Sequence, residues 1–412
     1  CLQVAGGTLA DDMAGEPLLP VGIDRVALFG PVAGPLWVHA CGSGRGEVIS
    51  TDVTVCTEDG TVVATVEGLH VRRAPAGLLR DGAASALFHA VEWREADPPR
   101  AAAGGRVVVV AADPAHGETL AAALGDRADV VADPADLPEL HDSDTVVDLT
   151  AWNEAGDVAR SLALARRILH GEARPALVVV TQGAVLDDPR PWQAARWGLA
   201  ATLALEHPEL RVRRVDADTL DAVAAELAGA DGEDMVVWRN GRRRAARLTA
   251  RLPEQTGRPV LRGTVLVTGG LGGVGRRLAG WAADRGAEAL VLAGRSADPG
   301  LAEVLSGEFG VPVRIVAADV STEAGVAAML AAADGLPPLR TVVHAAGVQA
   351  PGLLAELGEA ELWAALAAKA TGAELLDRAT RGPGLDYFIL VSSIASVLGA
   401  AGQGGYAAAN AF

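Results

Sequence analysis

Residues 264–281 read TVLVTGGLGGVGRRLAGW, and this stretch decides the fold. An apolar run leads into a glycine-rich turn and then into a segment with helical periodicity. Gly269, Gly273 and Gly275 have the spacing G-x-x-x-G-x-G, which lets a backbone turn tightly and brings a pyrophosphate to a helix N-terminus. A tight strand–helix turn without a ligand gives the same pattern. Here the turn opens a series of strand–helix repeats, which favours a dinucleotide site.

The same alternation of apolar strands and Ala/Leu-rich helices occurs twice in the chain, which predicts two parallel sheets. The strand candidates of the second copy are residues 263–270, 288–296, 313–320, 340–347 and 386–393. Those of the first copy are residues 106–113, 145–150, 176–182 and 211–217, and no glycine fingerprint follows the first of them. Residues 175–185 correspond to residues 386–396. We interpret the pattern as a duplicated α/β unit, one copy degenerate and one active.

The N-terminal part reads differently, as β-structure. Residues 25–30, 35–40 and 48–56 are strand-like, and Asp59-Gly60 lies between two alternating apolar runs, which is a strong hairpin signal. Residues 74–77 (APAG) break the pattern and serve as a linker.

Composition excludes several classes of protein. A net charge of −17 over 412 residues argues against nucleic-acid binding, and we interpret the basic run at residues 239–247 as a solvated face or turn. The three cysteines, Cys1, Cys41 and Cys56, lack metal-site spacing, so we expect no metal. With no signal peptide and no apolar run long enough for a membrane span, we expect a cytoplasmic protein. Because the chain starts without Met, we expect it to be a piece of a longer protein.

The end of the second strand indicates which dinucleotide binds. An NAD site usually has an acid there, whereas LAGRS supplies Arg295 and Ser296, which suit a 2′-phosphate. We therefore expect NADPH; the alternative is an arginine that only caps the strand. Asp319 and Val320 are expected beside the adenine. In HAAG (344–347) the small residues leave room for the cofactor, and we expect His344 to pack rather than to act in catalysis.

Four polar residues near the C-terminus have a characteristic spacing. Tyr406 and Asn410 are four residues apart and share one face of a helix. Ser393 lies 13 residues before Tyr406 at a strand end, and Lys369 lies 24 residues before Ser393 in a helical segment. The Gly and Ala residues around Tyr406 let a cofactor and a substrate come close to its phenol.

This constellation resembles the short-chain dehydrogenase/reductase superfamily and, more narrowly, the ketoreductase domain of modular (type I) polyketide synthases. TGGLGGVG, HAAGV, AAKATGAELLD and VSSIASVLGAAGQGGYAAANAF carry the resemblance, which covers nearly everything after residue 85. It implies reduction, with NADPH, of a β-ketoacyl thioester on an acyl carrier protein. It also implies neighbouring synthase domains and a homodimeric parent synthase. The cofactor residues expected on this basis are Thr268, Gly269, Gly270, Leu271, Gly273, Val274, Gly275, Gly294, Arg295, Ser296, Asp319, Val320, Ala345, Ala346, Gly347, Lys369 and Tyr406.

The resemblance also implies catalytic roles. Tyr406 would be the general acid, and the positive charge of Lys369 would favour loss of the phenolic proton while the same lysine binds the nicotinamide ribose. Ser393 would donate a hydrogen bond to the substrate carbonyl. Asn410 would hold a water molecule or the lysine in place.

Residues 1–75 resemble the C-terminal end of a dehydratase domain of such synthases, which has a double hotdog fold. CLQVAGG resembles the stretch after the catalytic Asp, and that Asp and the catalytic His would precede Cys1. We therefore expect an α/β protein with three segments: a hotdog-like dehydratase fragment at 1–75, a degenerate Rossmann-like subdomain at 80–255 and a catalytic Rossmann subdomain at 256–412. Both Rossmann-like subdomains are expected to be doubly wound parallel sheets. Ketoreductases of the family continue past Phe412, so we do not expect this chain alone to be an efficient enzyme.

Three alternatives stay open: a non-catalytic ketoreductase-like domain, an epimerase that uses the same site, and a docking or dimerisation fragment. Neither stereochemical fingerprint of the family is present. Gln349, Ala350 and Pro351 replace Leu-Asp-Asp, and Leu398 stands where the other class has Trp. Gln403 replaces the His of a subclass that reduces epimerised α-branches. The missing Asp pair leads us to expect an L-configured β-hydroxyl.

Overall fold

The structure is a computed structural model in which two compact units can be described. The described residues are 18–30, 36–43, 48–73, 88–100, 105–152, 158–186, 189–251, 259–296, 298, 300–349, 351–382 and 384–412. The first unit comprises Cys1–Glu92 and Arg247–Gln255, and the second Trp93–Ala246 and Thr256–Phe412. Within the described residues, no helix has the length and apolar character needed to span a membrane.

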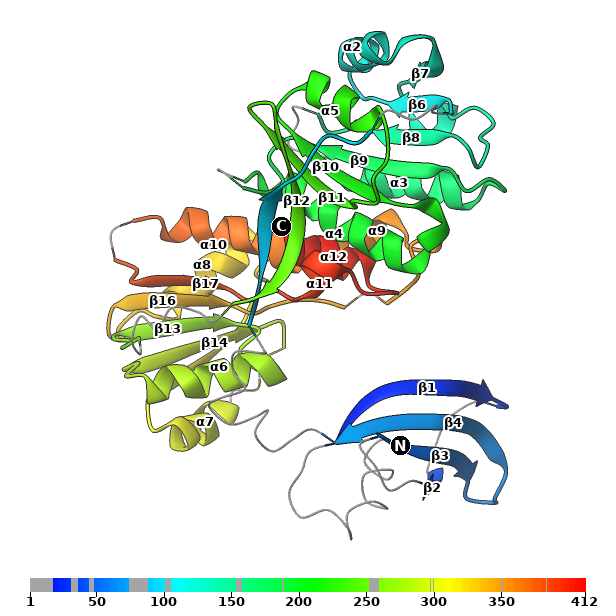
Figure 1. Ribbon diagram of the computed structural model, residues 1–412. Coiled ribbons are helices and arrows are strands. Elements are labelled where there is room, and N and C mark those ends of the chain that lie inside the picture. Colours follow the sequence, from blue (N-terminus) through cyan, green and yellow to red (C-terminus); the bar gives the residue numbers. More distant parts are fainter. Residues whose placement is uncertain are drawn as a thin grey trace. The chain divides into compact units, whose positions relative to one another are not determined.

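The first unit contains an antiparallel sheet of four strands, as its alternating sequence predicts (Figure 1). The strand order is β1-β4-β3-β2, with β1 at Leu18–Leu28, β2 at Leu36–Ser43, β3 at Val48–Thr57 and β4 at Val62–Arg73. The expected hairpin joins β3 to β4. Gly60 has a φ of 87°, and Asp59 accepts a hydrogen bond from the amide of Thr61 at 3.0 Å. The expected linker at residues 74–77 lies outside the described residues.

The C-terminal half of the second unit, which the sequence predicts to be the catalytic copy, contains a parallel sheet in the order β15-β14-β13-β16-β17. The strands are β13 (Thr264–Thr268), β14 (Ala289–Gly294), β15 (Val313–Ala317), β16 (Leu339–His344) and β17 (Tyr387–Leu390). All five strand candidates of this half are confirmed. The strand order reverses between β13 and β16, and ligands of open α/β sheets bind outside the carboxyl ends of the strands at such a point.

Helices cover both faces of this sheet. Successive residues of a strand point to opposite sides, so alternate residues pack against different helices. Val265 and Val267 of β13 pack against α6 (Gly273–Asp284) and α7 (Leu301–Phe309). Leu266 points the other way, towards α8 (Glu323–Ala331) and α10 (Gly372–Thr380). This double burial explains the continuous apolar runs in the sequence.

The other half of the second unit, the degenerate copy, holds most of a sheet in the order β5-β12-β11-β10-β9-β8-β6-β7. Its strands are β5 (His89–Glu95), β6 (Val107–Val110), β7 (Ala128–Val131), β8 (Thr145–Asp148), β9 (Ala176–Thr181), β10 (Arg213–Ala217), β11 (Met235–Arg239) and β12 (Arg242–Ala250). The helices are α2 (Pro114–Leu124), α3 (Val158–Leu169), α4 (Pro191–Glu206) and α5 (Leu220–Leu227). The run β7-β6-β8-β9 has the same order as β14-β13-β16-β17, so β9 and β17 correspond, as the duplication predicts.

The basic run at residues 239–247 is a turn only in part. Asn240 and Gly241, with φ of 53° and 72°, join β11 to β12, and an Asn-Gly pair is a typical hairpin signal. The expected solvated face is wrong for Arg243, which is 3% exposed and forms an ion pair with the buried Glu226 at 2.7 Å. The run belongs to a mixed edge of the sheet, where β12 is antiparallel to β11.

The helices that follow the two corresponding strands pack against each other. After β17 come α11 (Ala395–Leu398) and α12 (Gly404–Ala411), and both contact α4 (Figure 1). The approach is very close, since a Cβ on Gly198 would lie 2.3 Å from the carbonyl oxygen of Ala407. The degenerate half therefore supports the helix that carries Tyr406.

Candidate active site

A cleft opens along the carboxyl ends of β13, β14, β15 and β16, at the point where the strand order reverses. It has two adjoining parts, of about 650 Å³ and about 310 Å³, which share lining residues such as Gly269, Arg295 and Gly347. The larger part is also lined by Lys369 and Tyr406, and the smaller part by Asp319. The glycine turn, the lysine and the tyrosine, which are far apart in the sequence, thus face one space.

The glycine turn has the backbone geometry that close approach of a phosphate requires. Gly269 has a φ of 65°, which a side chain disfavours. A Cβ on Gly275 would lie 2.1 Å from the carbonyl oxygen of Gly269, so the turn and α6 can pack only without it. Around Gly273 nothing lies within 4 Å of such an atom. The turn therefore leaves open space in front of the α6 N-terminus, where backbone N–H groups favour an anion.

Arg295 and Ser296 lie at the end of β14 and are exposed at the edge of the cleft. Among the described residues, the Arg295 guanidinium makes no hydrogen bond or ion pair. The carboxylate of Asp319 accepts hydrogen bonds from the Ser321 hydroxyl at 2.6 Å and the Ser321 amide at 2.9 Å. These bonds, with a smaller contribution from the charge of Arg295, lower the pKa of Asp319. A cation and a hydroxyl group therefore remain available to a ligand.

A hydrogen-bonded chain connects the glycine turn to the segment of Lys369. The amide of Ala346 donates to the Thr268 hydroxyl at 3.2 Å, and that hydroxyl lies 2.7 Å from His344 Nδ1. His344 Nε2 lies 3.1 Å from the carbonyl oxygen of Lys369. A carbonyl only accepts, so Nε2 carries the proton and Nδ1 accepts from Thr268. His344 is therefore a packed, hydrogen-bonded residue of the core behind the cleft, as expected.

Lys369 lies in a π-helical turn, Ala367–Thr371, between α9 (Glu359–Leu366) and α10. Its ammonium group donates to the carbonyl oxygen of Val391 at 2.7 Å, and the residue is 9% exposed. Burial lowers the pKa of Lys369. A Cβ on Gly347 would lie 3.0 Å from Lys369 Cε, so the missing side chain makes room for the lysine.

Tyr406 lies in the first turn of α12 and lines the cleft, whereas Asn410 and Ser393 do not line it. The side-chain Nδ2 of Asn410 donates to the Tyr406 backbone carbonyl at 2.8 Å. The side-chain Oδ1 of Asn410 is buried without a hydrogen-bond partner among the described residues. The Ser393 hydroxyl accepts from the amide of Ala395 at 3.3 Å. Ser392, which sequence reasoning passed over, lines the cleft and donates to the Asn410 carbonyl at 2.7 Å.

The cleft brings together all the predicted site residues except Gly270, Ser393 and Asn410, which do not line it. The roles of these residues stay predictions. Gln349, which the sequence analysis named for stereochemistry, also lines the cleft. Sequence reasoning missed eleven other lining residues, most of which lie next to predicted ones or near Lys369. They are Gly272, Ala293, Ala318, Ser321, Met329, Val348, Ala364, Ala367, Ala368, Val391 and Ser392. Strand ends at the reversal of the strand order are a signal that could have identified several of them.

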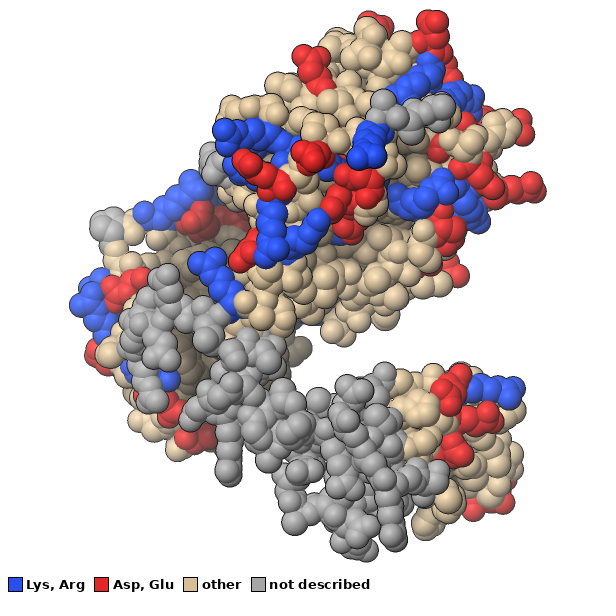
Figure 2. Space-filling view, viewed as in Figure 1, with Lys and Arg blue, Asp and Glu red and all other residues tan. Residues whose placement is uncertain are grey.

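The charges of the second unit are mixed rather than gathered into one basic surface. On the face shown in Figure 2, acidic and basic side chains lie next to one another. The basic β12 hairpin is an example, since Arg242 pairs with Glu95 at 3.2 Å and Arg243 with Glu226. Among the described residues, no cluster of His, Cys, Asp and Glu could hold a metal ion.

Three family profiles match successive parts of the chain. Residues 1–81 match the "Polyketide synthase dehydratase N-terminal domain", residues 91–248 the "Polyketide synthase extender module SpnB, Rossmann fold domain", and residues 263–412 the "KR domain". The first match confirms a dehydratase fragment; its description names the N-terminal domain, where we expected the C-terminal end.

Solved structures and curated proteins agree with these profiles. "Structure of A-type Ketoreductases from Modular Polyketide Synthase" is 33% identical with a TM-score of 0.69, and 79% of each chain is covered. "Structure of A1-type ketoreductase" is 33% identical with a TM-score of 0.67, covering 79% of this chain and 78% of that one. The pikromycin polyketide synthase component PikAIII of Streptomyces venezuelae is 42% identical over an alignment of 252 residues that covers 56% of this chain. The chain spans only 16% of the length of that relative.

Proposed function

The chain belongs to the ketoreductases of modular polyketide synthases, and from this premise we propose that it reduces a β-ketoacyl thioester to a β-hydroxyacyl thioester with NADPH. The substrate is carried on an acyl carrier protein during polyketide chain extension. The single observation that carries the proposal is the convergence of the glycine turn, Lys369 and Tyr406 on one cleft.

The cleft fits a nicotinamide dinucleotide. The open space before Gly273 suits the pyrophosphate, and the smaller part of the cleft, beside Asp319, suits the adenine. Arg295 and Ser296 would bond a 2′-phosphate, because a guanidinium is always charged and offers several donors. When bound, the cofactor supplies a hydride to the β-carbonyl carbon.

The residues of the chain supply the proton and the positioning. Tyr406 gives its phenolic proton to the carbonyl oxygen as negative charge develops there, and the resulting phenolate is reprotonated from solvent. The Lys369 ammonium stabilises that phenolate and bonds the nicotinamide ribose. Its bond to Val391, together with the packing against Gly347, restricts where the ammonium group can lie.

Two further residues complete the proposed machinery. Ser393 donates its hydroxyl proton to the substrate oxygen, and its Oγ can still accept from the Ala395 amide, because a hydroxyl both donates and accepts. Asn410 offers the buried, unpartnered Oδ1 as an acceptor for a water molecule or for the lysine. A buried acceptor without a partner is costly, which supports a ligand at that atom.

We propose that the chain works beside other synthase domains, in a homodimeric parent synthase, with segments 1–75, 80–255 and 256–412 as its parts. The test is turnover of a β-ketoacyl thioester by the parent synthase, with one NADPH consumed for each β-hydroxyacyl thioester formed. Binding of NADPH without reduction would contradict the proposal and favour a non-catalytic domain.

A further inference from the structure

The last residue of α4, Glu206, connects the degenerate half of the unit to two segments beside the cleft. Its carboxylate is half-buried. Oε2 accepts a hydrogen bond from the amide of Leu354 at 2.8 Å, and Oε1 accepts one from the amide of Gly402 at 2.8 Å. Hydrogen bonds to an ionised acceptor are roughly twice as strong as neutral ones. One charged side chain therefore holds two backbone segments.

Both segments lead directly to residues of the proposed site. Gly402, with a φ of 71°, precedes Gln403, the N-cap of the helix α12 that carries Tyr406. The Gly402 carbonyl accepts from the amide of Gly352 at 2.9 Å, which joins the segment of Gly402 to the segment of Leu354. Upstream of Gly352, the chain lines the cleft at Gln349. A shift of either segment would therefore move a wall of the cleft.

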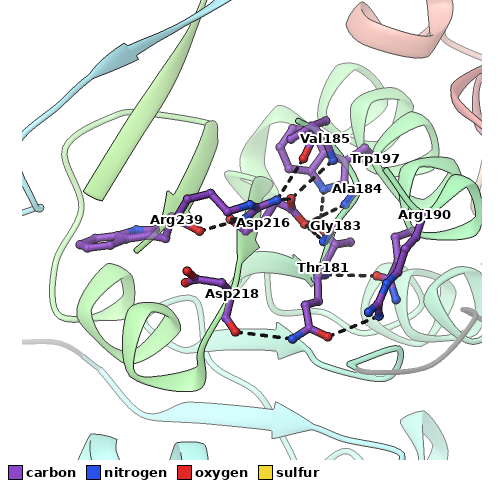
Figure 3. A network of polar contacts seen from close by, with 12 residues as sticks. Thr181, Gly183, Ala184, Val185, Arg190, Trp197, Asp216, Asp218 and Arg239 are labelled. Carbon is purple, nitrogen blue, oxygen red and sulfur yellow. Dashed lines mark hydrogen bonds and ion pairs between the residues drawn. The ribbon is translucent and has the colours of Figure 1, made fainter. Parts of the chain in front are cut away.

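The helix that carries Glu206 is itself anchored at its other end, in the network shown in Figure 3. Asp216, fully buried at the end of β10, accepts from the Thr181 hydroxyl at 2.7 Å and the Gly183 amide at 2.8 Å, and it pairs with Arg239. The indole N–H of Trp197, on α4, donates to Thr181 at 2.8 Å. The loop before α4 and the first half of the helix are thus bonded to the sheet.

Close packing also restricts how α4 and the segments that lead to α12 can move relative to one another. A Cβ on Gly399 would lie 2.5 Å from the backbone of Ala201, and one on Gly404 would lie 2.4 Å from Leu354 Cδ2. Contacts of this kind limit how far the helices can separate or shift. Directional hydrogen bonds from Glu206 oppose such shifts as well.

We propose that Glu206 is a positioning residue for reduction: it sets the place of the α12 N-terminus, and thus of the Tyr406 phenol, relative to the cleft. The inference rests on the proposed function and assigns the degenerate half a specific part in it. Glu206→Gln keeps the shape of the side chain but turns an NH₂ group towards one of the two amides, so one segment is released.

The first test measures reduction of a β-ketoacyl thioester in the parent synthase. Glu206→Gln should lower kcat by about 10- to 100-fold through misplacement of the reacting groups, and leave the Kd of NADPH within about twofold. Glu209→Gln is the matched control, because Glu209 pairs with His207 at the surface and should leave kcat unchanged. In the Tyr406→Phe background, Glu206→Gln should lower kcat little further, because the phenol that Glu206 positions is already absent. Equal effects in both backgrounds would overturn the proposal.

The second test needs no turnover, so it separates this proposal from the proposed function. Amide hydrogen exchange at Leu354 or Gly402, whichever amide faces the NH₂ group of the glutamine, should become at least about tenfold faster in Glu206→Gln. Exchange at both amides should stay unchanged in Glu209→Gln. Unchanged exchange in both variants would refute the bridge even if the enzyme reduces its substrate. Should Glu206→Gln not fold, Glu206→Asp, which keeps the charge and shortens the reach, gives the same comparison.

Discussion

The imidazole of His344 donates its Nε2 proton to the backbone carbonyl of Lys369, 3.1 Å away, and so holds the proposed catalytic lysine from behind. That carbonyl lies in the π-helical turn and also accepts from the backbone amide of Gly372, so it has two donors. Because His344 Nδ1 accepts from Thr268, a proton added to the ring would break the chain that continues to the glycine turn. The neutral ring therefore belongs to the folded state.

Acid should weaken the fold through His344. Burial lowers the pKa of His344 from 6.5 to about 4. Between these pH values the unfolded chain binds more protons than the folded one, so the free energy of unfolding rises with pH through this window. The contribution of His344 is lost as the pH falls from 6.5 to about 4. The shift corresponds to roughly 3 kcal/mol. Urea unfolding from pH 4 to 7.5 should show a smaller pH dependence for His344→Gln than for the unchanged chain; parallel curves would contradict this assignment.

Cofactor preference should depend on Arg295. Loss of a charge-assisted bond to the 2′-phosphate costs about 1.5–3 kcal/mol, so Arg295→Ala should reduce the NADPH-over-NADH preference in kcat/KM by about 10- to 100-fold. Arg314→Ala, on the neighbouring strand β15 and outside the cleft, is the control. Equal use of both cofactors by the unchanged enzyme would show that Arg295 does not read the phosphate.

Proton transfer should depend on Tyr406. Tyr406→Phe keeps the ring and removes the proton, so kcat should fall by at least ~10²-fold while NADPH still binds. The other tyrosine of the chain, Tyr387, is 39% exposed on β17, and Tyr387→Phe should leave kcat unchanged. Stopped-flow NADPH oxidation measures both variants. Retained activity in Tyr406→Phe would place the acid elsewhere.

Local patterns in the sequence predicted the parallel sheets and the cleft. The central strands β13 and β14 carry continuous apolar runs, because both of their faces are buried. The turn at Gly269 needs its positive φ, so its glycine is visible in the sequence. Lys369 and Tyr406 were found through family spacing, and their roles stay predictions, as do the segment boundaries.

The contacts between the two halves could not be predicted in the same way. The close approach at Gly198 involves a glycine inside a helix, which sequence reasoning treats as neutral or unfavourable. Glu206 is one acidic residue at a helix end, and only the fold brings Gly402 to it. The strand β7 and the buried Arg243 were missed because short strands and basic runs resemble solvated loops.

The contact between α4 and α12 should tolerate no side chain at Gly198. An added methyl group would lie 2.3 Å from the Ala407 carbonyl oxygen, so Gly198→Ala should destabilise the unit by about 1–3 kcal/mol and displace Tyr406. Gly307→Ala is the control, because nothing lies within 4 Å of its added atom in α7, and it should stabilise by about 0.4–1 kcal/mol. Thermal unfolding and kcat should be measured for both variants. Equal changes in stability and in kcat for Gly198→Ala and Gly307→Ala would contradict the prediction.

The product should have an L-configured β-hydroxyl group, because the side chains beside the nicotinamide decide which carbonyl face meets the hydride. The position of the family's Leu-Asp-Asp is occupied here by Gln349, which lines the cleft, by Ala350, outside the described residues, and by Pro351. Without those carboxylates, no charged pair at this position guides the thioester arm to the D-forming side. Leu398, 49% exposed, keeps an apolar surface where the opposite class has Trp. One such contact is worth about 1–3 kcal/mol, which is 10- to 200-fold in selectivity.

Chiral chromatography of the reduced thioester should show mainly the L-alcohol, and the combined change Gln349→Leu, Ala350→Asp and Pro351→Asp should raise the D fraction. Mainly D-alcohol from the unchanged enzyme would mean that other groove residues direct the arm.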